Sequence, residues 1–221
     1  MPTYYLFWLL IPTVLAIVSA HPSVLLVVVF ALVARRWMPD PIDYLRHARR
    51  IASLKSQIDI NPANATARTQ LAQIWLSKRR PHRAIPQLEA ALARDPESAE
   101  LQYLLGLALQ RAGRSEAALA PLSESLAKDQ KVRYGSAYLA IGDALADCKR
   151  TDEAIEAYER YLKINTSSLE GYTKLVRAKR RAKDEPGARK VREQGLDTFR
   201  VLPGYQRRKQ LVWWLQLKLG G

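Results

Sequence analysis

The sequence has few of the residues that usually carry chemistry. Its single cysteine, Cys148, excludes an intrachain disulfide. The three histidines, at positions 21, 47 and 82, are too scattered to give a usual metal-ligand spacing with that cysteine. A glycine-rich phosphate loop, a G-x-S-x-G elbow and an H-E-x-x-H motif are all missing. We therefore expect a protein without catalytic residues, metal or cofactor.

Charged residues are missing from the N-terminal part of the chain. All 35 basic and 21 acidic residues follow an uncharged stretch that ends at Ala34. A single helix over residues 4–34 would be about 46 Å long, which exceeds the roughly 30 Å thickness of a bilayer core. His21-Pro22 interrupts the stretch with a predicted turn. We predict a transmembrane anchor at residues 1–38, formed by a hairpin of two short helices. A single tilted span, or a signal peptide ending near Ala20, are alternatives.

Residues at the ends of this anchor predict how it is placed. Trp8 and Trp37 would lie at a membrane interface, where aromatic side chains are frequent. Arg35 and Arg36 follow the apolar stretch directly, so the positive-inside rule places the rest of the chain in the cytoplasm. We expect a membrane protein, in the inner membrane if the source is bacterial, whose charged domain faces the cytoplasm.

The net charge of +14 favours an anionic partner. Anionic lipid headgroups would suit a chain at a membrane, and an acidic protein would also suit the charge. Nucleic acid is not expected, because no recognition helix, zinc site or aromatic RNA-binding motif accompanies the basic residues.

The charged part of the chain repeats itself with a period close to 34 residues. Two sets of small residues and one pair of prolines share this spacing, and each longer set contains one interval of 36. These positions are Ala72, Gly106 and Gly142; Ala84, Ala118, Ala154 and Ala188; and Pro62 and Pro96. Agreement between three sets indicates stacked supersecondary units. A longer loop near residues 131–134 would hold the two extra residues.

This pattern resembles the tetratricopeptide repeat, a pair of helices with small residues at fixed positions. The resemblance covers residues 65–98, 99–132, 135–168 and 169–202. The matching residues are Leu71, Ala72, Trp75, Ala84, Leu88, Ala91 and Pro96 in the first repeat; Leu105, Gly106, Leu109, Ala118, Leu122 and Leu126 in the second; Tyr138, Ile141, Gly142, Leu145, Ala154, Tyr158 and Tyr161 in the third; and Tyr172, Leu175, Val176, Ala188 and Leu196 in the fourth. The resemblance implies an all-α solenoid of helical hairpins, in which stacking makes the core.

The predicted repeats lie between two single helices. Residues 39–64 predict a linker and an N-terminal capping helix, and residues 203–221 predict a C-terminal capping helix. The C-terminal helix could instead contact the membrane interface through Trp213 and Trp214.

Three residues mark helix ends within the repeats. Ser115 and Thr151 are predicted helix N-caps, and Gly113 a helix C-terminal cap.

The resemblance also implies where a partner would bind, because such repeats use the surface of their first helices as a peptide groove. Carried onto this sequence, that surface holds Tyr103, Leu107, Asp143, Thr173, Arg177 and Arg180. We expect an apolar anchor of the partner near Tyr103 and acidic residues near Arg177. The Lys/Asn clamp of chaperone-binding relatives is not found.

These expectations combine into one function. We predict a non-enzymatic, membrane-anchored adaptor or assembly factor that binds a protein or peptide partner. A structural subunit of a membrane protein complex, and a factor similar to those of cytochrome c assembly, are alternatives. An unrecognised hydrolase is a third alternative that no motif favours.

Overall fold

The computed structural model describes residues 41–219. The chain divides into two compact units, residues 1–52 and 53–221. The first described helix, α3 (Pro41–Ile60), crosses this boundary. No helix within the described range is long and apolar enough to cross a membrane.

The predicted membrane anchor lies outside the described residues. This applies to residues 1–38 as a whole and to the four predicted interface residues Trp8, Arg35, Arg36 and Trp37.

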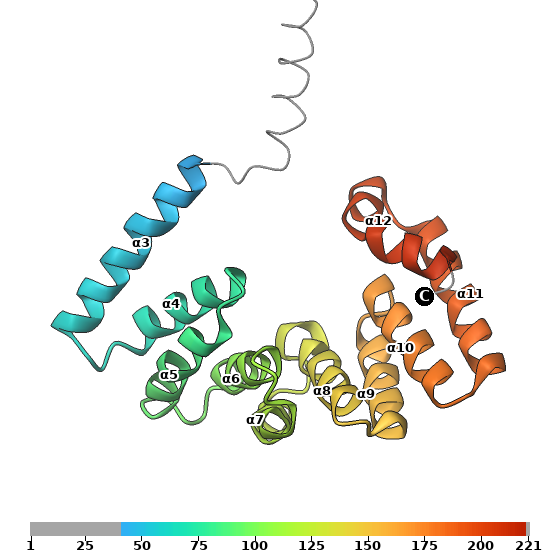
Figure 1. Cartoon of the computed structure of the whole chain (residues 1–221), viewed down its shortest axis with the longest axis horizontal. Coiled ribbons are helices and arrows are strands. Elements are labelled where there is room, and N and C mark those ends of the chain that lie inside the picture. The colour runs from blue at the N-terminus through green and yellow to red at the C-terminus, as the bar shows by residue number, and fades with distance from the viewer. Residues whose placement is uncertain (1–40, 220–221) are drawn as a thin grey trace, which may run out of the picture. The chain divides into compact units, whose positions relative to one another are not determined.

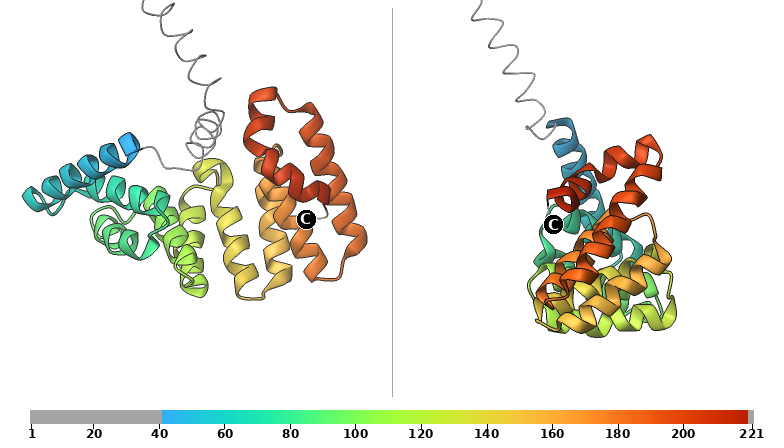
Figure 2. Two further views of the ribbon diagram at one scale, coloured as in Figure 1. Left: turned by 45° about the horizontal axis from the view of Figure 1, so that its top comes forward. Right: turned by 90° about the vertical axis from the view of Figure 1, so that its right-hand side faces the viewer.

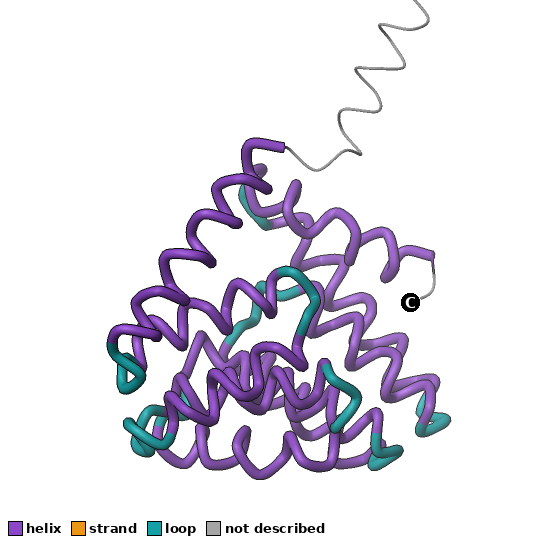
Figure 3. The backbone as a smooth tube through the Cα atoms, turned by 60° about the vertical axis from the view of Figure 1, so that its left-hand side comes forward, coloured by secondary structure: helices purple, strands orange, loops and turns teal. Residues whose placement is uncertain are grey.

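Eight helices form four successive pairs joined by short loops (Figures 1 and 3). The pairs are α4 (Ala65–Ser77) with α5 (Pro81–Leu92), α6 (Ala99–Arg111) with α7 (Ser115–Lys128), α8 (Ser136–Asp147) with α9 (Thr151–Ile164), and α10 (Leu169–Arg181) with α11 (Glu185–Val201). Each predicted repeat interval holds one pair. A short 3-10 turn, η1 (Val132–Gly135), precedes α8, and a single helix, α12 (Gly204–Leu219), follows the last pair.

The pairs stack in chain order (Figure 2). Each first helix packs on its own second helix, and each second helix packs on the first helix of the next pair. Helix α12 closes the stack by packing on both α10 and α11. Its Leu217 is fully buried in the core there. The all-α solenoid predicted from the repeats is therefore confirmed.

Small residues let the two helices of a pair approach each other closely. A Cβ added at Gly106 would lie 2.8 Å from Cδ2 of Leu122, and one added at Gly142 would lie 2.6 Å from Cδ1 of Tyr158. Both distances are well below van der Waals contact. The fourth pair tolerates Val176 at the corresponding position, where it is completely buried. The repeating small positions are thus contact points between paired helices.

The turn inside every pair has the same backbone geometry. One residue adopts a left-handed conformation in each turn: Arg79 (φ 55°), Gly113 (φ 78°), Lys149 (φ 61°) and Lys183 (φ 63°). The next residue donates its N–H to a carbonyl five residues back, as Arg114 does to Leu109 at 2.9 Å and Asp184 to Lys179 at 2.9 Å. This is the Schellman ending of a helix. The predicted C-terminal cap at Gly113 is confirmed, and three further turns use the same geometry without glycine.

Polar side chains cap three of the four first helices but only one second helix, α11, where Asp184 accepts the Gly187 N–H at 2.9 Å. Asn64 and Ser98 accept N–H bonds at the starts of α4 and α6, at 2.9 and 3.3 Å, and Ser168 does so at α10 at 3.2 Å. Ser115 and Thr151 do begin α7 and α9, but the cap positions are one residue earlier and carry no side-chain cap bond. The prediction that Ser115 and Thr151 are N-caps was therefore wrong, because cap and first-turn positions look alike in sequence.

We expect Gly142→Ala to destabilise the protein by about 1–3 kcal/mol, because its methyl group would overlap the Tyr158 ring. Urea unfolding followed by circular dichroism measures this. Gly204→Ala is the matched control, since a Cβ there meets nothing within 4 Å. Equal effects of the two substitutions would contradict the close-contact explanation.

We expect Lys183→Gly to stabilise the protein by about 0.5–1 kcal/mol, because glycine adopts a positive φ without the Cβ clash that lysine suffers. Lys190→Gly, in the middle of α11 and exposed, should instead cost about 1 kcal/mol. The same unfolding assay compares both variants. Destabilisation by Lys183→Gly would show that the lysine side chain matters more than its backbone strain.

Candidate functional site

A polar cleft lies on the face formed by the first helices of the repeats. Its volume is about 270 Å³, and it is lined by residues of α6, α8, α9 and α10. The lining includes two acidic residues of α8, Asp143 and Asp147, and two arginines of α10, Arg177 and Arg181. Each of these two pairs has i, i+4 spacing, which places its members on one side of a helix. The cleft therefore carries carboxylates on one helix and guanidinium groups on another.

Asp143 is at the centre of a hydrogen-bonded network at the base of this cleft. Its carboxylate accepts bonds from the Tyr158 hydroxyl at 2.9 Å and from the Lys174 ammonium at 2.6 Å. Lys174 also contacts Glu170 at 2.9 Å. These bonds connect α8, α9 and α10, so the network fixes how the third pair meets the fourth.

Burial changes the protonation of this network. It raises the pKa of Asp143, and the attraction of Lys174 opposes the rise. Burial alone would lower the pKa of Lys174, but Asp143 and Glu170 together raise it above its ordinary value. Burial and the Asp143 charge both raise the pKa of Tyr158 strongly. We infer that Lys174 remains a cation and that Asp143 is held in place as its partner.

The charged side chains in the outer part of the cleft form fewer ionic contacts within the protein. Asp147 accepts bonds from Ser115 at 2.9 Å and Gln110 at 3.2 Å. Arg177 donates a 3.0 Å bond to the side-chain carbonyl of Gln216 on α12. Arg181 is exposed and forms no hydrogen bond or ion pair with the described part of the chain. A ligand carboxylate could therefore replace a neutral amide at Arg177 and meet an unpaired guanidinium at Arg181.

Comparisons with known proteins agree with this architecture. Two tetratricopeptide-repeat family profiles match the sequence, one over residues 69–132 and the other over residues 135–168. The chain contains tetratricopeptide repeats. A search among curated proteins finds no relative by sequence.

Solved structures show the same fold. A crystal structure of MamA is 26% identical, with a TM-score of 0.63 over 67% of this chain and 85% of that one. The type IV pilus biogenesis factor PilW is 22% identical, with a TM-score of 0.64 over 80% of this chain and 86% of that one. YrrB, described as a TPR protein with an unusual peptide-binding site, is 18% identical, with a TM-score of 0.60 over 71% and 79%.

The cleft brings together only part of the predicted tetratricopeptide groove. Asp143 and Arg177 both line it, as described above. Tyr103 does not; its side chain is only 8% exposed, and burial raises the pKa of its hydroxyl. Leu107 is half-buried and lies outside the cleft lining. An apolar anchor of a partner therefore has little of Tyr103 to contact, which corrects the expectation placed on it.

Helix α12 covers another part of the predicted groove. Thr173 has no exposed surface. Its hydroxyl donates to the Leu169 carbonyl at 2.8 Å and lies 3.5 Å from the backbone carbonyl oxygen of Trp213 on α12. Gln210 of α12 also accepts the Leu169 N–H at 2.7 Å. Thr173 is therefore removed from the candidate partner surface. Arg180 is half-buried and points to Glu185 of α11, at 3.8 Å, rather than into the cleft.

The two C-terminal tryptophans pack inward. Trp213 and Trp214 both contact the core, and Trp214 stacks on Phe199 with a centroid distance of 5.2 Å. Both residues remain half-buried, and their predicted contact with a membrane interface stays a prediction. The exposed side of α12 carries aliphatic residues instead, of which Val212 is 63% and Leu219 85% exposed.

Sequence reasoning missed Lys174 and Gln110 as parts of the cleft. Lys174 is in an otherwise basic helix and looks like one more surface cation, although its partner Asp143 lies 31 residues earlier. Gln110 bonds to Asp147 across 37 residues. Only the stacking of successive pairs creates these contacts. Within the described range, no group of His, Cys, Asp and Glu residues could hold a metal ion.

We expect Lys174→Met to destabilise the protein at neutral pH by about 1–3 kcal/mol, because it leaves the part-buried Asp143 carboxylate without its cation. The variant should raise the pKa of Asp143 further. The cost is then fully present above that raised pKa and decreases as the pH falls and Asp143 takes up a proton. Urea unfolding at neutral and mildly acidic pH measures the difference.

Two variants act as controls for this prediction. Lys163→Met removes an exposed lysine that forms no ion pair among the described residues, so its effect should be small at either pH. Adding Asp143→Asn to Lys174→Met should recover part of the lost stability at neutral pH. A cost that does not change with pH would contradict the ionic explanation.

Proposed function

We propose that the protein is a non-enzymatic adaptor that holds a segment of a partner protein in the cleft between α6, α8 and α10. The observation that carries this proposal is the pair of cleft arginines, of which Arg181 is unpaired and Arg177 is bonded only to a neutral amide. Their i, i+4 spacing suits an acidic side chain or a terminal carboxylate. The tetratricopeptide fold supports the proposal, since it is a protein-interaction architecture.

The chemistry of the cleft defines what the partner segment should look like. An acidic group of the partner would bind Arg177 and Arg181, and a donor group would bind the free side of the Asp147 carboxylate. Asp143 is already satisfied by Lys174 and Tyr158, so it positions the cleft rather than binding the partner. We infer a segment that carries an acidic residue close to a lysine, arginine or amide.

We further infer that residues 1–38 tether this adaptor to a membrane, with the repeats on the cytoplasmic side. The uncharged stretch and the arginines that follow it support this part of the proposal. The bound partner would then be held at the membrane surface, where binding in the cleft is favoured by a raised local concentration.

Photo-crosslinking in intact cells tests the cleft and the tether together. A photoreactive residue at position 181 should yield an adduct with one dominant partner protein, and the adduct should stay with membranes washed at high pH. A photoreactive residue at Arg189, exposed on α11 and remote from the cleft lining, is the matched control.

The outcomes separate the two parts of the proposal. Equal adducts from positions 181 and 189 would contradict the cleft as the binding site. A specific adduct that washes off the membranes would contradict the tether alone. Arg177→Glu combined with Arg181→Glu should reduce partner capture about tenfold or more, since the attraction to an acidic group of the partner would become a repulsion.

A further inference from the structure

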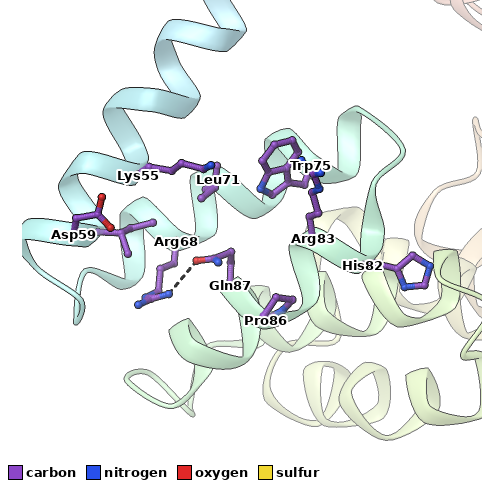
Figure 4. Close-up of a pocket in the computed structure, with 10 residues that line it drawn as sticks. Lys55, Asp59, Arg68, Leu71, Trp75, His82, Arg83, Pro86 and Gln87 are labelled. Atoms are coloured by element: carbon purple, nitrogen blue, oxygen red, sulfur yellow. Dashed lines mark hydrogen bonds between the residues drawn. The ribbon is translucent and has the colours of Figure 1, made fainter.

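A second pocket lies at the N-terminal end of the repeat stack, far along the chain from the cleft. Its volume is about 590 Å³, and it lies between residues 55–59 of α3 and the first helix pair, α4 and α5 (Figure 4). The accessible apolar surface comes from the half-buried Ile58 and the exposed Pro86, whereas Leu71 and Trp75 are buried beneath them. All of its lining residues belong to the second compact unit.

This pocket lies at the start of the stack, where the first helix pair has no complete pair before it. The first helices α6, α8 and α10 each pack against the second helix of the preceding pair. Helix α4 has no preceding pair among the described residues. Within residues 53–60 of α3, Leu54 is the only buried side chain. Residues 53–60 of α3 therefore cover this end of the stack only in part.

The rim of the pocket is positively charged. Lys55, Arg68 and Arg83 surround it, and Asp59 is the single acidic residue in its lining. None of the three cations forms a salt bridge with a described residue. Arg68 bonds only to neutral acceptors, the Gln87 side chain at 2.9 Å and the Pro62 carbonyl at 3.0 Å. The pocket thus has a positive charge that the described protein does not neutralise.

The geometry of Trp75 restricts what can bind. Its ring is 7% exposed, and the Arg83 guanidinium lies 5.1 Å from the ring centroid, over its face. A nucleic-acid base therefore has no free aromatic face on which to stack. A free inorganic anion would bind the basic side chains but leave the apolar surface of the pocket uncovered. A second copy of this strongly basic chain would be repelled by the rim.

We propose that this end pocket binds an acidic amphipathic helix of a partner protein, with an apolar side chain placed against Ile58 and Pro86 and carboxylates against Lys55, Arg68 and Arg83. The fit follows from the partly covered end of the stack, the apolar surface and the unneutralised cations. Helix-in-groove recognition uses this combination of apolar anchors and flanking charge. The site goes beyond the cleft, because it uses different helices and needs a different partner segment.

Binding of a synthetic peptide to the full-length protein in uncharged detergent tests the proposal. The probe is a fluorescein-labelled helical peptide with glutamates on one face and a phenylalanine flanked by leucines on the other. Fluorescence anisotropy gives its Kd. Lys55→Glu combined with Arg83→Glu should raise the Kd about tenfold or more. Replacing the phenylalanine of the peptide by serine should weaken its binding to the unaltered protein to a similar extent.

A matched pair of substitutions controls for net charge. Lys163→Glu combined with Lys190→Glu makes the same change of charge at exposed sites away from the pocket. It should change the Kd by no more than about twofold, since exposed charges farther than a Debye length are screened. Lys55→Glu alone, at an exposed residue without an ion pair, should give an intermediate loss without affecting the fold.

Three results would overturn the proposal. Equal losses in the two double variants would mean non-specific attraction to a basic protein. A loss caused by Arg181→Glu, but not by Lys55→Glu, would place the peptide in the cleft instead. Full displacement of the peptide by anionic lipid vesicles, with no effect of its phenylalanine, would identify the pocket as a site for lipid headgroups.

Discussion

The close approach of two helix backbones within each pair is the contact on which the rest of the structure depends. Gly106 against Leu122 and Gly142 against Tyr158 leave no room for a Cβ, so the position of one helix along the other is fixed. Once each pair is fixed, its remaining apolar side chains can only be buried by the next pair, and the chain grows as a stack. The cleft follows from this order, because it needs α6, α8 and α10 at a constant spacing. Tyr158 contributes both to the helix pair and to the cleft, since its ring packs on Gly142 and its hydroxyl donates a hydrogen bond to Asp143.

The basic character of the chain has several separate structural origins. Some cations lie at the C-terminal ends of first helices, as Arg79, Lys149 and Lys183 do in their left-handed turns, where they complement the helix dipole. Others are used internally, as Lys174 is against Asp143 and Glu170. Among the cations without an ion pair to a described residue, Arg177 and Arg181 line the cleft, and Lys55, Arg68 and Arg83 line the end pocket. In the proposals above, these two clusters are the binding sites for acidic protein segments.

The two ends of the stack are closed in different ways. At the C-terminal end, α12 covers Thr173, buries Leu217 and brings Gln216 to Arg177, so the capping helix also holds one side chain of the cleft in place. At the N-terminal end, residues 53–60 of α3 bury one leucine and leave a pocket beside Trp75. A well-covered end contributes stability, whereas a partly covered end leaves apolar surface and charge for a ligand. This asymmetry is why we place the second site at the start of the stack.

The sequence by itself determined the helix pairs, their number and the residues at which they touch, because a 34-residue period of small and large residues is a local property of the chain. It also indicated Asp143 and Arg177, whose helical positions follow from the repeat. It could not show that Tyr103 and Thr173 are buried, that Lys174 pairs with Asp143, or that Trp213 and Trp214 face the core. Those facts depend on which helix covers which, over separations of some 30 to 40 residues. Burial of a side chain is decided by its neighbours in space, and only the tertiary structure supplies them.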